Sequence, residues 1–430
     1  MVLSSAACLP IEEEFTCASD DQCVRDGQAG VCESAGHCAF ADDACPVSRR
    51  RFAEHAGELS QTCVITGALY WASPDGDDEN PGSEALPFRT VGHGASVLAP
   101  GDGLLVRPGT YEEAITLSSV GTSWEAPMTI TAWPRRGATL RAPSSDVRAL
   151  DIADPARFVS IEGFVIDGTV GVGEPVMIYQ DNIRLRDCEI FGSPVSAGSL
   201  TGYPGDGGYC QLLDLDLHDN GTTLPEAEVG SPAGGIIAYT AHNLVQGCHV
   251  HANAGVGIML YSQELPTHDN VIRNNVVSGG VRDDAAGIFL SSGAGSIAYN
   301  NVVHDVAGPG IRLDYDAVDC RVLHNTVYAA AEGALVVGLE ASGTLVRNNI
   351  FAGADGAEGV IDDATEAGVN TLANNVIVDP LFVDAGGGDF PVRADSPAVD
   401  QGATEQDVTV DFDGTPRPQG AAYDVGAYER

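Results

Sequence analysis

The chain has 430 residues, of which 61 are acidic and 21 are basic, giving a formal net charge of −40 at pH 7. Because this charge repels phosphates, DNA and RNA are excluded as partners. No apolar run approaches the roughly 18 residues that a transmembrane helix needs, so a membrane-spanning protein is excluded as well. The acidity has two interpretations: solubility in a salty medium, or carboxylates that bind Ca²⁺, a cation that prefers oxygen ligands.

The sequence opens with a short stretch, residues 1–7, that we interpret as the remnant of a signal sequence. Its small residues directly before Cys8 resemble the end of a bacterial lipoprotein signal, which implies a lipidated Cys8 and a lipid anchor. Two features depart from that pattern: Ser5 stands where Leu is usual, and the apolar stretch is far too short. A wrongly assigned start would explain both departures.

A cysteine-rich segment, residues 8–66, contains few large apolar residues and cannot build a core. We expect three disulfides among the six cysteines that follow Cys8, with the pairing left open: Cys17, Cys23, Cys32, Cys38, Cys45 and Cys63. A zinc module is the alternative, but no Cys-x₂-Cys pair occurs in this segment. Disulfides predict an extracellular or outer-surface location.

The middle of the chain repeats one pattern of β-branched residues separated by Gly-rich turns. The repeated segments are 159–167, 183–191, 210–218, 243–251, 270–278, 296–304, 320–328, 344–352 and 370–378. Their spacing and short strands predict a parallel β-solenoid of roughly ten coils over residues 67–378, with a cap near 84–100. Each coil climbs about 4.8 Å, the spacing of neighbouring strands.

The sixth position of each repeated segment forms one column. Its members are Phe164, Cys188, Leu215, Cys248, Asn275, Asn301, Asn325, Asn349 and Asn375. The five Asn predict a ladder of amides hydrogen-bonded along the solenoid axis. Cys188 and Cys248 are two coils apart, too far for a disulfide, and are expected to be buried free thiols.

A second strand in most coils carries side chains that alternation places outward. One outward row holds Met177, Ile237, Met259, Phe289 and Arg312, and a second holds Tyr179, Tyr239, Tyr261, Ser291 and Asp314. The predicted face is unusually apolar and aromatic for a solvated surface.

With this pattern established, residues 68–430 resemble the right-handed parallel β-helix superfamily of pectate-lyase-like proteins. The resemblance is carried by Tyr70-Trp-Ala-Ser-Pro74 and Val106-Arg-Pro-Gly-Thr-Tyr111 at the start, and by Asp379-Pro-Leu-Phe-Val383 and Asp424-Val-Gly-Ala-Tyr-Glu429 at the end. It implies an all-β right-handed helix, closed by a loop-rich segment over 379–430, with carbohydrate lying along the outward face of one sheet. These motifs are specific for the architecture and weak for activity.

The resemblance therefore implies a groove along Tyr179, Tyr239 and Tyr261, walled by residues 192–209 and 219–234. Sugar rings stack on flat aromatic faces, and the tyrosine hydroxyl adds a polar contact. His242 and His268 lie in turns beside the same face. The alternative is that these tyrosines pack under the long turns as a secondary core.

Polysaccharide lyase chemistry is the first candidate. A lyase needs a base that removes a proton next to a uronate carboxylate and a cation that stabilises the resulting charge. The chain has no Lys, so we expect Arg312 beside Asp314 as the cation and Tyr239 or Tyr261 as the base. Ca²⁺ would be held by Asp283, Asp284 and Asp314. An Arg312–Asp314 salt bridge without catalysis is the structural alternative.

Other chemistries have weaker support. Paired Asp283 and Asp284 are similar to those of polygalacturonase-like hydrolases, but the coils lack a Gly-His-Gly. The recurring His218, His251 and His304 share one outward position and suit either metal binding or turn capping, and Ser278 interrupts their row. We therefore expect a secreted or surface-attached protein that interacts with polysaccharide, with a non-catalytic adhesion scaffold as the alternative.

Overall fold

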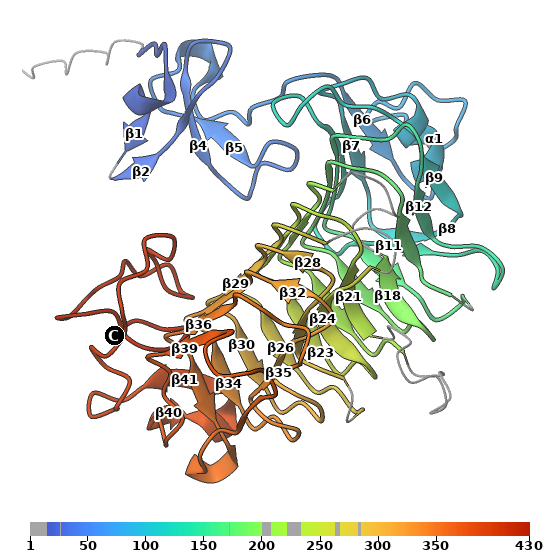
Figure 1. Cartoon of the computed structure of the whole chain (residues 1–430). Helices are drawn as coiled ribbons and strands as arrows, with labels where there is room; N and C mark the ends of the chain where they lie inside the picture. Colours follow the sequence, from blue (N-terminus) through green and yellow to red (C-terminus); the bar gives the residue numbers. More distant parts are fainter. Residues whose placement is uncertain are drawn as a thin grey trace, which may run out of the picture.

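The computed structural model describes residues 15–25, 27–171, 173–199, 208–221, 234–262, 267–282 and 285–430. Cys8, Asp283 and Asp284 lie outside these residues. The described chain forms a parallel β-solenoid that follows a disulfide-rich N-terminal region (Figure 1). None of the helices found in it is long and apolar enough to cross a membrane.

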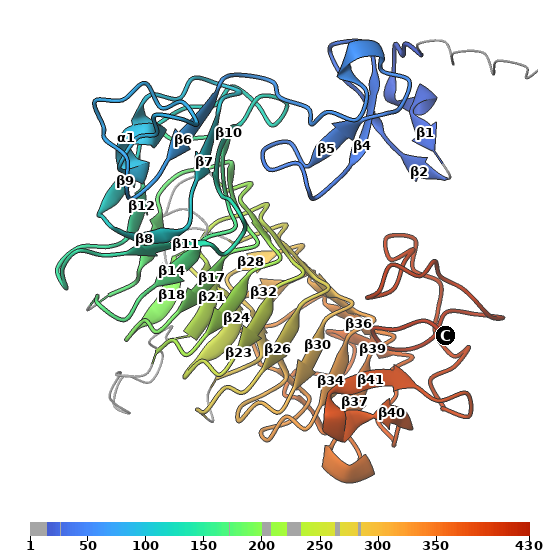
Figure 2. The same cartoon turned by 180° about the vertical axis from the view of Figure 1, so that it is seen from behind.

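Ten coils each contribute one strand to each of three parallel sheets, and they stack as a staircase (Figure 2). Sheet 1 has one further strand at each end, β6 (Leu69–Ala72) and β39 (Thr371–Ala373). Sheet 1 contains β6 (Leu69–Ala72), β7 (Gly103–Val106), β10 (Met128–Ala132), β13 (Val159–Glu162), β16 (Ile183–Arg186), β19 (Gln211–Leu213), β22 (Leu244–Gln246), β25 (Val271–Arg273), β29 (Ile297–Tyr299), β33 (Arg321–Leu323), β36 (Leu345–Arg347) and β39 (Thr371–Ala373). Sheet 2 contains β8 (Gly109–Glu112), β11 (Ala138–Arg141), β14 (Val165–Asp167), β17 (Glu189–Phe191), β20 (Asp216–His218), β23 (His249–His251), β26 (Val276–Ser278), β30 (Val302–His304), β34 (Thr326–Tyr328) and β37 (Ile350–Ala352).

Sheet 3 closes each coil and contains β9 (Ile115–Leu117), β12 (Leu150–Ile152), β15 (Val176–Ile178), β18 (Ser196–Ser199), β21 (Gly234–Ala238), β24 (Val256–Leu260), β27 (Ile288–Leu290), β31 (Ile311–Leu313), β35 (Leu335–Val337) and β38 (Ile361–Asp363). A short parallel pair, β28 (Gly293–Ala294) and β32 (Ala317–Val318), runs beside them. The ten strands of sheets 2 and 3 confirm the predicted solenoid of roughly ten coils.

One continuous core runs through the solenoid. The middle residue of each sheet 1 strand points inward, and the register stacks Leu185 on Leu212 and Val245 on Ile272, all at most 1% exposed. Where sheet 1 turns into sheet 2, one residue per coil has positive φ, for example Asp187, Asp214 and Asn274. Asp and Asn tolerate this left-handed conformation better than other non-Gly residues, which explains their recurrence at this corner.

The predicted asparagine ladder is confirmed. Oδ1 of Asn325 accepts hydrogen bonds from the backbone N and Nδ2 of Asn301, at 3.0 and 2.9 Å, and Asn325 Nδ2 donates to Asn349 Oδ1 at 3.0 Å. Cys188 and Cys248 are buried free thiols, as expected. A similar contact joins Asn243 to Asn270 at the sheet 3–sheet 1 corner, where Asn243 Nδ2 donates to Asn270 Oδ1 at 2.9 Å. It was not predicted, although Asn243, Asn270 and Asn370 all stand first in their repeated segments.

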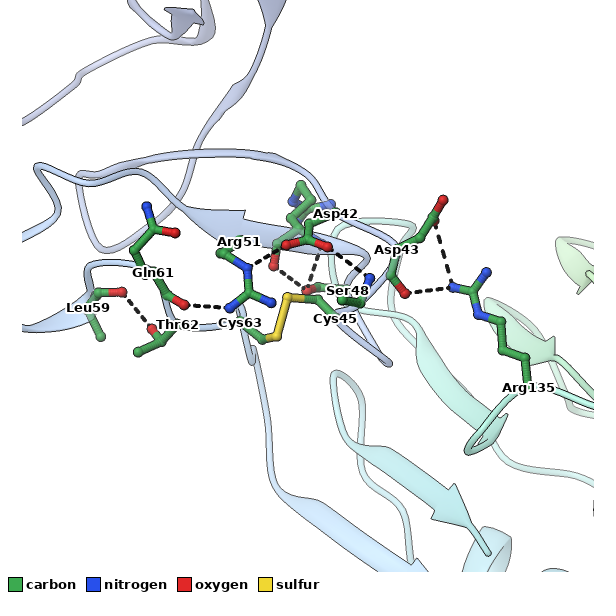
Figure 3. Close-up of a disulfide and its surroundings, with 12 residues drawn as sticks. Asp42, Asp43, Cys45, Ser48, Arg51, Leu59, Gln61, Thr62, Cys63 and Arg135 are labelled. Atoms are coloured by element: carbon green, nitrogen blue, oxygen red, sulfur yellow. Dashed lines mark hydrogen bonds and ion pairs between the residues drawn. A yellow bond between two sulfur atoms is a disulfide. The ribbon is translucent and has the colours of Figure 1, made fainter. Parts of the chain in front are cut away.

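The N-terminal region contains η1 (Asp20–Gln22), β1 (Val24–Arg25), β2 (Gln28–Ala29), β3 (Val31–Cys32), β4 (Cys38–Ala41), β5 (Arg50–Phe52) and η2 (Gly57–Leu59). The three expected disulfides form, and the structure supplies the pairing: Cys17–Cys32, Cys23–Cys38 and Cys45–Cys63. Arg49 Nε donates to Glu162 Oε2 of β13 at 2.9 Å. Figure 3 shows Asp43 facing Arg135 of the solenoid beside the Cys45–Cys63 disulfide. This region therefore contacts the first coils.

A helix covers the first coils, and the C-terminal segment packs along the outer sides of the last ones. Helix α1 (Val91–Ser96) begins after Thr90, whose Oγ1 accepts from the His93 backbone N, and its Gly94 packs close to Leu104 of β7. At the other end lie η3 (Ala354–Gly356), β40 (Phe382–Asp384), η4 (Ala385–Gly387) and β41 (Asp389–Val392). Residues beyond β41 pack on the outer side of sheet 1, where Val408 joins Tyr299 and Leu323.

A buried histidine joins the C-terminal segment to the solenoid. The Nε2 atom of His324 lies 2.8 Å from Nδ2 of Asn348, which donates to it, and its ring lies 5.7 Å from that of Tyr423. Burial first, and then repulsion from Arg417, lowers the pKa of His324 to about 3. The imidazole is therefore neutral in the folded protein at neutral pH.

Replacing Asn325 by Ala should destabilise the solenoid. The substitution leaves buried donors of Asn301 without an acceptor, and each unsatisfied group costs about 1–3 kcal/mol. The thermal midpoint of the purified variant measures the loss. Asn375→Ala, at the partly exposed end of the ladder, should lower the midpoint less. Equal midpoints for both variants and the parent would contradict a stabilising ladder.

His324→Asn should make the protein less sensitive to acid. Because the folded pKa is below the unfolded value of about 6.5, the stabilisation is present at neutral pH and is lost as pH falls from about 6.5 towards 3. Asn suits the position, since Asn300 and Asn348 adopt the same positive φ in neighbouring coils. Thermal midpoints at pH 7 and pH 4.5 should differ less in the variant than in the parent. Equal pH sensitivity of the variant and the parent would contradict this role of His324.

Candidate functional site

The predicted tyrosine column lies at the corner where sheet 3 leads into sheet 1. Strand register places Ala238 beside Leu260, Leu260 beside Leu290 and Leu290 beside Leu313. The residues that follow these positions therefore stand in adjacent coils: Tyr239, Tyr261, Ser291 and Asp314. Tyr179 occupies the same position after β15 and is 37% exposed, whereas Tyr239 and Tyr261 are half-buried. We call residues 179–182, 208–209, 239–242, 261–262, 267–269, 291–295 and 314–319 the tyrosine ridge.

The outward row that precedes the ridge is buried rather than solvated. Met177, Ile237, Met259 and Phe289 are each at most 7% exposed. Met259 and Phe289 form a small cluster with Ala286, and Tyr261 packs against it. The expectation of an open apolar face is therefore wrong for this row. For Tyr261, the alternative that the tyrosines pack as a secondary core is therefore partly correct.

Arg312 and Asp314 form the salt bridge that was the structural alternative. Arg312 donates from one terminal nitrogen to Asp314 Oδ2 at 2.7 Å. The guanidinium carbon lies 5.0 Å from the ring centroid of Phe289 and 5.5 Å from that of Tyr315. The Nε atom of Arg312 is buried without a hydrogen-bond partner. The charge of Arg312 is thus compensated within the protein, while one donor stays unused.

A second group on the ridge brings the predicted His242 and His268 together. Their rings meet edge to face at 4.7 Å, and Tyr209 stacks on His242 at 4.6 Å. His268 Nδ1 lies 2.8 Å from Asp269 Oδ2. Tyr209 and Asp269 were missed by sequence reasoning. The available signal was position, since Tyr209 stands two residues before the start of β19, just as His242 stands two residues before the start of β22.

The ridge is long enough for an extended ligand. It runs from Tyr179 after β15 to Tyr315 after β31, five strand spacings along sheet 3. At about 4.8 Å per coil this distance is roughly 24 Å. The side chain of Tyr209 is 51% exposed and that of Tyr315 is 49% exposed, so aromatic surface is present along the whole length. Residues 200–207 and 222–233 of the expected walls lie outside the described residues.

Of the predicted calcium ligands, Asp314 is the one that the structure describes, so the calcium site stays a prediction. Asp314 is engaged by Arg312 and follows β31. The histidines of sheet 2 show the local contacts expected for turn capping in two cases. Nδ1 of His218 and of His304 lies 2.8 Å from the carboxylate of the next residue, Asp219 and Asp305.

Comparison with known proteins shows which of them share this fold. Residues 215–379 match the model of the family described as periplasmic copper-binding protein (NosD). Pectate lyase Pel9A superposes with a TM-score of 0.63 at 16% identity, covering 85% of this chain and 97% of that one. A rhamnogalacturonan lyase superposes with a TM-score of 0.56 at 17% identity, covering 81% of this chain and 99% of that one. The predicted right-handed, pectate-lyase-like β-helix is confirmed.

A curated relative adds a short local match. Over 57 residues, the chain is 37% identical to the uncharacterized protein YwoF of Bacillus subtilis. The match covers 13% of this chain and 12% of the relative. It therefore concerns a single local segment.

Proposed function

We propose that this protein binds polysaccharide along the tyrosine ridge. The observation that carries the proposal is the row of partly exposed aromatic rings, Tyr179, Tyr209 and Tyr315, that recurs along one corner of the solenoid. Aromatic faces provide large contact area at low entropic cost, and the tyrosine hydroxyl supplies a hydrogen bond. Half-buried Tyr239 and Tyr261 lie between them and widen the surface.

Two further features support this proposal. The solved structures that share the fold over most of this chain are described as a pectate lyase and a rhamnogalacturonan lyase. The three N-terminal disulfides suit an oxidising compartment, which agrees with a secreted or surface-attached protein. A lipid anchor at Cys8 belongs to the same proposal and would hold the solenoid at a bacterial surface.

The charge of the ridge narrows the choice of glycan. Asp181, Asp269, Asp316 and Asp319 stand on it, and the whole chain has a net charge of −40. An acidic polysaccharide is repelled unless divalent cations bridge the two carboxylate-bearing partners. We therefore infer that a neutral glycan binds directly, and that an acidic glycan binds only with Ca²⁺.

Lyase activity is a second candidate, favoured by Arg312. The guanidinium carbon lies 5.5 Å from the ring centroid of Tyr315 on the ridge, but the unpartnered Nε is buried, so Arg312 would have to rotate toward the ridge to contact a uronate. Tyr239 or Tyr261 would serve as the base, and Asp283, Asp284 and Asp314 would bind Ca²⁺ in this version. The Asp314 salt bridge opposes it, since Arg312 would have to exchange partners. Glycoside hydrolysis has less support, and an adhesion scaffold remains the non-enzymatic alternative.

Removing exposed rings from the ridge should weaken glycan binding. A variant with Tyr179→Ala and Tyr209→Ala loses stacking surface worth roughly 0.5–1.5 kcal/mol per ring, or about five- to 150-fold in affinity for the pair. Binding to the polysaccharide identified by an array is measured by calorimetry. Val281→Ala removes another exposed apolar side chain, after β26, and should bind like the parent. Equal affinities of parent and double variant would remove the ridge from the proposal.

Lyase activity should depend on Arg312 and on Ca²⁺. Purified protein is incubated with acidic polysaccharides, with and without Ca²⁺, and the ultraviolet absorbance of unsaturated uronate is followed. The lyase version predicts new absorbance that Arg312→Ala abolishes, while the control Arg89→Ala, which replaces an exposed arginine before α1, keeps it. Glycan binding without product from any acidic polysaccharide would reject the lyase version and leave binding intact.

A further inference from the structure

The outer side of sheet 2 carries imidazole and carboxylate side chains that the tyrosine ridge does not use. His249 and His251 are the two ends of β23, and alternation along a strand places both on the same side. Asp216 of the neighbouring strand β20 pairs in register with His249, and His218 pairs with His251. These four side chains therefore stand together on two adjacent coils.

Three potential ligand atoms converge there. Oδ1 of Asp216 lies 3.1 Å from Nε2 of His251 and 3.6 Å from Nδ1 of His249. The three atoms all lie within 4.8 Å of one another. In a tetrahedral complex with bonds of about 2.0–2.2 Å, two donor atoms are separated by roughly 3.3–3.6 Å. The rings of His249 and His251 stack at 4.1 Å with their planes 25° apart, so one imidazole has to rotate before both nitrogens face one ion.

Neighbouring contacts hold this group in place. A terminal nitrogen of Arg136 donates to Asp216 Oδ2 at 3.3 Å, so Oδ1 is the oxygen that faces the imidazoles. His218 is turned to other partners, with Nδ1 at 2.8 Å from Asp219 and Nε2 at 3.4 Å from Glu189. Contacts of this kind orient the ligands of metal sites.

The group is bounded and accessible. In the next coil, Val276 and Ser278 occupy the positions beside His249 and His251, so no further ligand follows there. The side chain of His249 is 53% exposed, which leaves room for a water or an external ligand in a fourth position. Its ligands come from strands rather than loops, which favours a fixed geometry.

We propose that Asp216, His249 and His251 bind one Cu²⁺ or Zn²⁺ ion on the outer side of sheet 2. Imidazole nitrogens suit these late transition metals, whereas Ca²⁺ prefers oxygen ligands throughout. Cu²⁺ binds more tightly than Zn²⁺ in the general order of divalent affinities. The assignment itself rests on the convergence of the three atoms.

Calorimetric titration of the full chain, stripped of metal with a chelator, tests the site with Cu²⁺, Zn²⁺ and Ca²⁺ in separate experiments. One Cu²⁺ should bind to the parent, and a variant with His249→Ala and His251→Ala should lose more than about 100-fold in affinity. Electron paramagnetic resonance of the Cu²⁺ complex should show nitrogen coupling in the parent that this variant lacks. Ca²⁺ should not compete.

A matched control removes two histidines from the other His/His/Asp group. His242→Ala with His268→Ala on the tyrosine ridge should keep the parent's Cu²⁺ affinity and spectrum. Loss of binding in this control with retention in the sheet 2 variant would overturn the assignment, as would equal binding in both. Circular dichroism verifies that each variant is folded. If the double variant does not fold, Asp216→Asn provides the test, and unchanged Cu²⁺ binding by that variant overturns the proposal.

Discussion

Each coil of this solenoid takes its backbone hydrogen bonds from the coils beside it, and the sharp corners are where strand pairing alone leaves amides without partners. Asn275, Asn301, Asn325 and Asn349 solve this at the corner between sheets 1 and 2, because each side chain satisfies the backbone N of the residue one coil earlier. Buried polar groups must be paired in this way. Since the corners and the inward rows carry the stability, outward side chains are free to vary between coils. Both proposed sites consist of such outward side chains.

The two ends of the chain limit where function can lie. The N-terminal region contacts sheet 1 through Arg49, whose side chain is 10% exposed and faces Glu162 and Asp187. The C-terminal segment packs on later strands of the same sheet, with Arg321 paired to Asp407 and Arg347 to Glu405. Figures 1 and 2 show both ends on one side of the solenoid. The tyrosine ridge and the outer side of early sheet 2 strands remain accessible between these covered regions.

The architecture could be predicted from the sequence because the same residue pattern recurs in successive coils. A single Asn or β-branched residue means little, but Asn301, Asn325 and Asn349 at one spacing identify a column and therefore a register. The sites were predicted less well, since each is unique to one or two coils. Alternation along the strand correctly placed Phe289 and Met259 on the outer side of sheet 3. It could not show that other side chains cover them there. His249 was overlooked, although the His-x-His spacing within one strand places both imidazoles on one side.

Hydrogen–deuterium exchange with and without bound glycan tests the central claim, that polysaccharide lies along the tyrosine ridge. A glycan array supplies the ligand, with neutral sugars offered alone and acidic sugars offered with Ca²⁺. The account predicts protection of backbone amides at residues 179–182, 208–209, 239–242 and 314–319, with little change on sheet 1. Protection confined to the outer side of sheet 1, around Arg184 and Arg273, would contradict it, as would binding to none of the glycans.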